Sequence, residues 1–136
     1  MAQESRRRSY AERREDGLKA IDEMLSPEFR AFMENHADNG GFCSEISEIA
    51  IDNIFGQLWS RPGLDRRARS ILTIGILIGQ RFANELQEHF SIALKHDVTV
   101  EEIEEIIYHA SGYAGFPASN VARKAAIAAL KEAGLA

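Results

Sequence analysis

The chain has 136 residues, of which 45% are hydrophobic and 27% charged, with a formal net charge of −5 and a pI near 5.4. This length and composition predict one globular domain over residues 1–136, with a core of its own. The acidic balance argues against nucleic acid as a partner, since domains that bind phosphate backbones present a basic face. Cys43 is the single cysteine, which excludes an intrachain disulfide and favours a reducing compartment.

Hydropathy along the chain predicts a soluble, cytoplasmic protein without a membrane partner. The segment from Met1 to Ser5 is polar and does not begin an apolar secretory segment. The uncharged run in the most apolar segment, residues 70–80, is shorter than the ~20 residues that span a bilayer. Arginines at positions 6–8, 13 and 14 alternate with acidic residues, which is typical of a solvated helical face.

The first half of the chain is predicted to be helical. Apolar residues recur at helical spacing within residues 6–24 and 43–57. Between these segments, Ser26 followed by Pro27 is a good start for a further helix, because the serine caps free N–H groups and proline suits the first turn. Cys43 is expected to be a small buried hydrophobe and not a nucleophile.

The second half predicts three further helices, beginning with a long one over residues 66–96. This helix is apolar on most sides between Ile71 and Ile78, and such a helix must be surrounded, which favours a homo-oligomer with this segment near the contact. Thr99 and Glu102 form a capping box that starts the next helix.

Glycine interrupts the chain again near its end. The helix after Thr99 is expected to stop at Gly112 and at the segment 115–117, and the last helix is predicted over residues 117–133. No alternating strand pattern occurs, so the sequence predicts an all-α bundle of about six helices.

Glu85 and His89 lie four residues apart in the most apolar region and therefore share one helical face. The ordinary explanation of a lone histidine on such a face is a core residue with a satisfied ring. Glu85 favours an acid–base pair instead, because a carboxylate orients an imidazole and raises its pKa. Two ligands are too few for zinc, so no metal site is predicted.

A second candidate segment covers residues 108–117 and contains His109, Tyr113 and Phe116. Its two glycines allow a ligand to approach the backbone closely, and the helix that follows can bind an anion at its N-terminus. The simpler explanation is an ordinary turn between helices with aromatic packing.

A third candidate segment is the turn over residues 56–64. Arg61 beside Trp59 in a rigid turn can bind a carboxylate with two parallel hydrogen bonds. The simpler explanation is a solvent-facing turn in which Trp59 is a packing anchor.

Together these segments resemble the carboxymuconolactone decarboxylase family. The matching strings span about residues 50–125 in the family's order, and they are LWSRPGL at 58–64, Arg69-Ser70, Glu85-Leu86 with His89, Thr99 with Glu102, and YAGFPASN at 113–120. The first and last strings are specific to the decarboxylase branch of the family.

The resemblance implies a fold similar to alkyl hydroperoxidase D and a homo-oligomer, a hexamer or trimer. It also implies cofactor-independent decarboxylation of a small carboxylated unsaturated lactone in aromatic-compound catabolism. His89 would be the general acid, Glu85 would hold its tautomer, and Arg61 would anchor a carboxylate. The redox branch carries Cys-x-x-Cys where this chain has Phe82 and Glu85, which excludes thiol peroxidase chemistry.

The remaining residues of the expected site form its walls. Trp59, Tyr113 and Phe116 would exclude water, and His109 is a lesser member of the wall. Decarboxylase relatives usually place Arg where this chain has Gln87 and Ser91. Two alternatives therefore stay open, which are a non-decarboxylating isomerase, lactone hydrolase or cyclase, and a non-catalytic assembly or ligand-binding protein.

Overall fold

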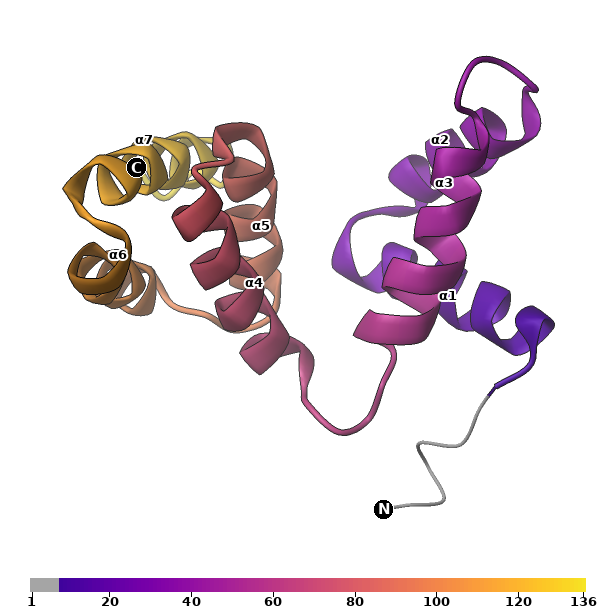
Figure 1. Cartoon of the computed structure of the whole chain (residues 1–136), viewed down its shortest axis with the longest axis horizontal. Helices are drawn as coiled ribbons and strands as arrows, with labels where there is room; N and C mark the ends of the chain where they lie inside the picture. The colour runs from indigo at the N-terminus through magenta and orange to yellow at the C-terminus, as the bar shows by residue number, and fades with distance from the viewer. Residues whose placement is uncertain (1–7) are drawn as a thin grey trace. The chain divides into compact units, whose positions relative to one another are not determined.

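The computed structural model describes residues 8–136, which form helices joined by turns (Figure 1). These residues contain seven α-helices and one π-helical segment, η1, and no β-strand, so the predicted all-α class is confirmed. Residues 6 and 7, predicted to begin the first helix, lie outside the described residues. Contacts divide the chain into two compact units, residues 1–65 and 66–136, each with its own core.

The first unit contains α1 (Tyr10–Met24), α2 (Pro27–Asp38), α3 (Glu45–Ile49) and η1 (Ala50–Trp59). The predicted start of α2 is confirmed, because the Ser26 hydroxyl accepts a hydrogen bond from the Phe29 N–H at 3.0 Å and Pro27 occupies the first turn. Ile21, Met33 and Ile51 form a buried apolar cluster in this unit.

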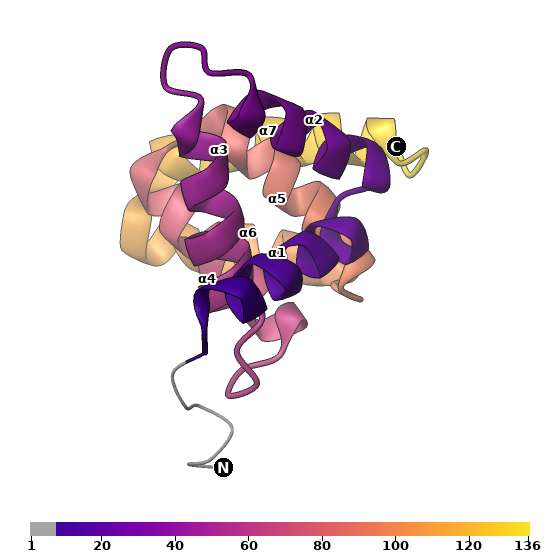
Figure 2. The same ribbon diagram turned by 90° about the vertical axis from the view of Figure 1, so that its right-hand side faces the viewer.

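α1 and η1 pack so closely that glycine is required on both helices (Figure 2). A Cβ atom on Gly17 would overlap the carbonyl oxygen of Ile51, and a Cβ atom on Gly56 would overlap that of Arg13. The wider π-helical turns of η1 are an uncommon conformation at this length. Backbone contact therefore fixes η1 against α1.

A charged pair reinforces this crossing. Arg14 of α1 binds Asp52 of η1 through Nε and through Nη2, which lies 2.9 Å from Oδ2. Asp52 is only 3% exposed, and its hydrogen bonds with Arg14 hold the pKa of this carboxyl below the ordinary value of 3.8. The first unit thus buries a carboxylate only together with its cation.

The second unit contains α4 (Arg66–Gln80), α5 (Ala83–Lys95), α6 (Val100–Ala114) and α7 (Phe116–Glu132). α4 contacts the other three helices, and α7 also contacts α5 and α6. Leu86 and Phe90 of α5 share a core cluster with five buried alanines of α7, at positions 118, 122, 125, 126 and 129. These short side chains let α7 lie close to its neighbours.

The predicted single helix over residues 66–96 is wrong, because α4 and α5 are separated at Arg81 and Phe82. Arg81 has a φ of 59°, and the N–H groups of Arg81 and Phe82 donate to the carbonyl oxygens of Ile78 and Leu77 at 3.1 and 3.2 Å. This left-handed helix end usually carries glycine or asparagine. With arginine there, the sequence lacked the usual mark of a helix end.

Two smaller predictions are also wrong. Cys43 is exposed and has a φ of 55°, because it lies in the turn before α3 and not on a buried helical face. α6 continues through Gly112 to Ala114 and ends at Gly115, whose φ is 90°. The predicted capping box of α6 is present, and none of the helices in the described part of the chain is long and apolar enough to cross a membrane.

Candidate functional site

Glu85 and His89 both lie on α5, as the sequence predicts. His89 is half-buried and Glu85 is exposed. Burial lowers the pKa of His89 below its ordinary value of 6.5, and the negative charge of Glu85 opposes that shift without overcoming it. The predicted influence of Glu85 therefore has the expected sign, while burial decides the outcome, so the imidazole is neutral at pH 7.

Gln87 and Ser91, at the positions where the resemblance led us to expect arginine, both form hydrogen bonds. The Gln87 side-chain amide donates to a carboxylate oxygen of Glu132 on α7 at 2.8 Å. The Ser91 hydroxyl donates to the Gln87 carbonyl oxygen at 3.3 Å. Gln87 thus connects α5 to α7, and neither side chain brings positive charge to the face of α5 near His89.

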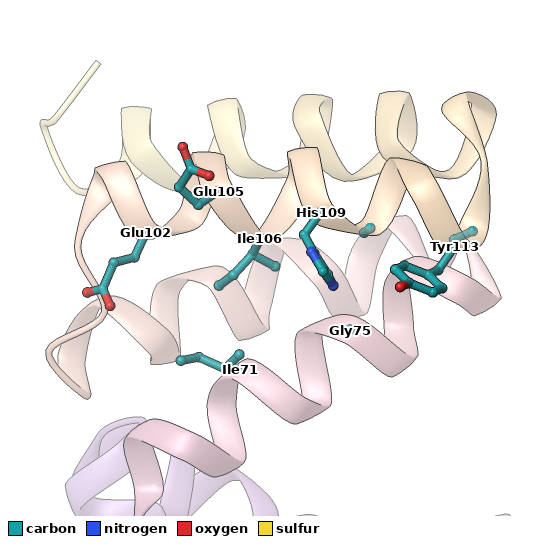
Figure 3. Close-up of a pocket in the computed structure, with 9 residues that line it drawn as sticks. Ile71, Gly75, Glu102, Glu105, Ile106, His109 and Tyr113 are labelled. Carbon is teal, nitrogen blue, oxygen red and sulfur yellow. The ribbon is translucent and has the colours of Figure 1, made fainter.

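A cavity of about 600 Å³ lies between α4 and α6 of the second unit (Figure 3). It is lined by nine residues, which are Ile71, Gly75, Glu102, Glu105, Ile106, His109, Ala110, Tyr113 and Ala114. Figure 3 shows Ile106 and His109 directed from α6 toward α4, with Glu105 at the upper rim. The cavity has the size of a small-molecule site.

His109 and Tyr113 are brought together in this cavity. Their ring centroids lie 5.3 Å apart with the planes tilted by 34°. The segment 108–114, for which the sequence suggested a turn between helices, is helical here, so the two rings follow one another by one turn of α6. On the opposite wall, a Cβ atom on Gly75 would have no heavy atom within 4 Å, so the absence of a side chain there leaves the cavity open.

Glu105 is a residue of this cavity that sequence reasoning missed. It lies four residues before His109, which repeats the spacing of Glu85 and His89. A search for every carboxylate one helical turn from a histidine would have found both pairs. The second unit therefore carries two Glu-x-x-x-His pairs, one on α5 and one on α6.

Trp59 and Arg61 belong to the first unit, at the end of η1. Trp59 is 7% exposed, in agreement with its interpretation as a packing anchor. Arg61 is exposed in the turn, where its backbone N–H donates to the Leu58 carbonyl oxygen at 3.2 Å. The turn itself is held by the Ser60 hydroxyl, which donates to the carbonyl oxygen of Phe55 at 2.7 Å.

The predicted site residues thus occupy four places, of which the turn with Trp59 and Arg61 is one. Glu85 and His89 share α5, while His109 and Tyr113 share the cavity, to which α5 contributes none of the nine lining residues. Phe116 is exposed at the first position of α7. Within the part of the chain that the structure describes, no three His, Cys, Asp or Glu residues gather as a metal ion would require.

Comparisons with known proteins bear directly on these residues. A family model described as the carboxymuconolactone decarboxylase family matches residues 48–128, which include all four places. A 4-carboxymuconolactone decarboxylase from Acinetobacter baylyi is 38% identical over 127 residues, covering 92% of both chains. A nitrosuccinic acid decarboxylase from Metarhizium robertsii is 38% identical over 104 residues, covering 76% of this chain and 71% of the relative.

The resemblance predicted from the sequence motifs is therefore confirmed. Both relatives are named decarboxylases, which supports a carboxy-lyase. A third relative, an uncharacterized 15.0 kDa protein from Paracoccus denitrificans, is 38% identical over 66 residues and covers 47% of this chain. The chain belongs to the carboxymuconolactone decarboxylase family.

Proposed function

We propose that this protein is a cofactor-independent decarboxylase of a small carboxylated unsaturated lactone, similar to 4-carboxymuconolactone, in aromatic-compound catabolism. The observation that carries the proposal is the half-buried His89, one turn from Glu85, in a chain 38% identical to such a decarboxylase over 92% of its length. In this proposal residues 1–136 work as one cytoplasmic family domain.

The chemistry requires no cofactor because the substrate accepts its own electrons. When the bond between the ring carbon and the carboxylate breaks, the electron pair moves through the ring alkene onto the lactone carbonyl, and CO2 leaves. The protein must stabilise the resulting enolate oxygen and deliver a proton to carbon. Nitrosuccinic acid, named for the second relative, likewise carries an electron-accepting nitro group, so both named substrates suit the same strategy.

His89 is the proposed proton donor, and Glu85 the residue that tunes it. Since burial lowers the pKa of His89, the free imidazole is neutral at pH 7. An anionic substrate beside it would favour the protonated form and so raise that pKa when the substrate binds. Binding would thus produce the acid that the reaction needs, with Glu85 supporting the positive charge.

Three of the remaining predicted residues keep the roles that the resemblance implies. Arg61 is predicted to anchor a substrate carboxylate, and Trp59 and Phe116 are predicted to exclude water. His109 and Tyr113, which the sequence also assigned to substrate binding, have no role in this proposal, because they line a cavity to which α5 contributes no residue.

We further propose that the protein is a homo-oligomer, a hexamer or trimer. α4 supports this proposal, because Leu72 and Ile76 are more than half exposed on a helix that is otherwise rich in apolar residues. Light scattering coupled to size-exclusion chromatography would give the mass directly, and a monomer at micromolar concentration would contradict the proposal.

A second candidate is a non-decarboxylating acid–base enzyme acting on a related lactone. The observation that favours it is the use of Gln87 and Ser91 in hydrogen bonds where decarboxylase relatives usually carry arginine. Incubation with 4-carboxymuconolactone distinguishes the two, because only decarboxylation releases CO2, whereas isomerisation or ring opening retains every carbon.

The decisive test of the proposed chemistry is CO2 release by the His89→Gln variant. Glutamine keeps the polarity of the site but cannot donate a proton at neutral pH, so turnover should fall by about 100-fold or more. Circular dichroism checks that the variant is folded. Turnover close to that of the wild type would remove His89 from the mechanism.

A pH profile tests the role of Glu85. The Glu85 charge raises the pKa of His89, so Glu85→Gln should lower it further and move the falling limb of kcat/KM to lower pH. Glu88→Gln is the matched control, because Glu88 is also exposed on α5 and the pKa shift of His89 is caused by burial and Glu85. An equal movement in both variants would mean that the effect of Glu85 is not specific.

A further inference from the structure

We propose that the cavity between α4 and α6 is a second small-molecule site, which takes a neutral ring compound bearing a hydroxyl group and not the anionic substrate of the decarboxylase. The site uses the second Glu–His pair, Glu105 and His109, together with Tyr113 (Figure 3). This inference goes beyond the proposed function, which rests on Glu85 and His89.

The walls of the cavity suit an apolar ring. Ile71 of α4 faces Ile106 and Ala110 of α6 across a space of about 600 Å³, which is within the range of small-molecule pockets. Gly75 leaves the α4 wall without a side chain beside them. A six-membered ring would cover this apolar surface and exclude water from it.

The polar groups of the cavity follow one helical stripe. Glu105, His109 and Tyr113 are spaced by four residues, so they succeed one another by a turn along α6. A hydroxyl group both donates and accepts hydrogen bonds, and it can therefore pair with an imidazole nitrogen or with the Tyr113 hydroxyl. The stripe thus offers a ring compound a place for one polar group.

The charges at the cavity favour a neutral occupant over an anion. Glu102 forms an ion pair with Arg67 and accepts a hydrogen bond from the Thr99 N–H at 3.0 Å, so its charge is already balanced. Glu105 adds a negative charge at the rim. A carboxylate ligand would meet this charge and would lose its hydration against apolar walls, and both effects weaken its binding.

The cavity is also distinct from the Glu85–His89 pair. That pair lies on α5, whereas the lining residues come from α4 and α6. Each helix therefore carries its own glutamate and histidine at a spacing of four residues, and the two pairs can be tested independently.

Two matched glycine variants test the cavity. Gly75→Leu places a side chain into the cavity, and Gly79→Leu adds the same side chain on α4 at a position that does not line it. A Cβ atom at either position has open space around it, and leucine favours a helix over glycine, so both variants should fold. Tyr113→Ala is a second probe, because this side chain is exposed at the cavity and supports no core contact.

Binding is measured with phenol and benzoate, which share a ring but differ in charge at pH 7. Titration is followed by calorimetry and by the imidazole resonances of the four histidines, with His109 assigned through His109→Gln. Phenol should bind with a Kd of about 1 mM, as expected for so small a ligand, and benzoate about tenfold more weakly. Phenol should shift the His109 resonance.

The variants give outcomes that support or overturn the proposal. Gly75→Leu should weaken phenol binding by about tenfold or more and Tyr113→Ala by about threefold, while Gly79→Leu stays within about twofold of wild type. No saturable phenol binding by the wild type, equal losses in both leucine variants, or benzoate binding at least as tight as phenol would overturn it.

A separate measurement distinguishes this inference from the proposed function. His89→Gln should retain phenol binding while losing CO2 release, since His89 does not line the cavity. Loss of phenol binding in a folded His89→Gln variant would overturn the claim of two independent sites. Retained turnover in that variant would contradict only the proposed function.

Discussion

The helices of the two units pack through different kinds of contact. In the first unit, glycines at positions 17 and 56 bring α1 and η1 into backbone contact, and Arg14 encloses the buried Asp52 beside that crossing. In the second unit, the alanines of α7 pack against Leu86 and Phe90 in an apolar cluster. One unit depends on backbone contact and a charged pair, and the other on small apolar side chains.

This difference teaches where each unit tolerates change. Overlap with a backbone carbonyl cannot be relieved by a rotamer change, so the crossing of α1 and η1 fixes its glycines individually. In the second unit, a Cβ atom added to the helix glycines Gly75, Gly79 or Gly112 would have no heavy atom within 4 Å. Replacing a helix glycine by alanine should therefore destabilise the first unit at Gly17 or Gly56 and stabilise the second unit.

The largest expected effect comes from comparing Gly56→Ala with Gly75→Ala. At Gly56 the new methyl group would overlap the Arg13 carbonyl oxygen, and the free energy of unfolding should fall by about 3 kcal/mol or more. At Gly75 the methyl group has open space in the middle of α4, and alanine should raise the free energy of unfolding by about 0.5–1 kcal/mol.

Urea denaturation measures this comparison, with two probes that separate the units. Trp59 is the single tryptophan and is buried at the end of η1, so its fluorescence reports on the first unit. Far-ultraviolet circular dichroism reports on helices of both units. The comparison would be wrong if Gly56→Ala left the fluorescence midpoint unchanged, or if Gly75→Ala lowered the midpoint seen by circular dichroism.

A smaller effect is expected when the charge of Asp52 is removed. Asp52→Asn turns an amide N–H toward Arg14, which loses one of its two hydrogen bonds with this side chain and keeps its bond to Glu48, and the free energy of unfolding should fall by about 1–3 kcal/mol. Asp38→Asn, at the exposed end of α2, is the control and should change little.

The same carboxylate gives the first unit a sensitivity to acid. Its pKa is lower in the folded state than the ordinary 3.8, so its stabilisation is present above pH 3.8 and is lost as pH falls through the folded value. The urea midpoint followed by Trp59 fluorescence should decrease in acid, and Asp52→Asn should make this decrease smaller. An unchanged acid profile would show that other groups dominate it.

The starts of several helices were predictable because they depend on a few capping residues that are close together in the sequence. Ser26 with Pro27 and Thr99 with Glu102 start helices in the structure as their sequences indicate. The break at Arg81 was not predictable, since an arginine holds the left-handed conformation that glycine usually takes. Neither Arg81 nor Phe82 is a residue type that marks a helix end in the sequence.

The candidate site likewise has a part that was predictable from the sequence and a part that was not. The spacing of Glu85 and His89 placed them together on α5, because helical periodicity is a local property. The direction of the His89 pKa shift depended on how deeply the ring lies against its neighbours, so the influence of Glu85 was predictable from the sequence and that of burial was not. The cavity with Glu105 needed α4 and α6 to be placed opposite each other.

The smallest expected effect is a dependence of the second unit's stability on pH, caused by His89. Burial lowers the pKa of His89 in the folded state below 6.5, so the unfolded state takes up the proton first as pH falls past that value. Stability should therefore decrease below about pH 6.5, and His89→Gln should reduce that decrease.

His96, whose pKa burial lowers in the same direction, should account for part of the remaining decrease in stability. Urea midpoints from circular dichroism between about pH 5 and pH 8 cover this titration, and an unchanged slope in His89→Gln would show that the imidazole is as easily protonated in the folded protein as in the unfolded chain.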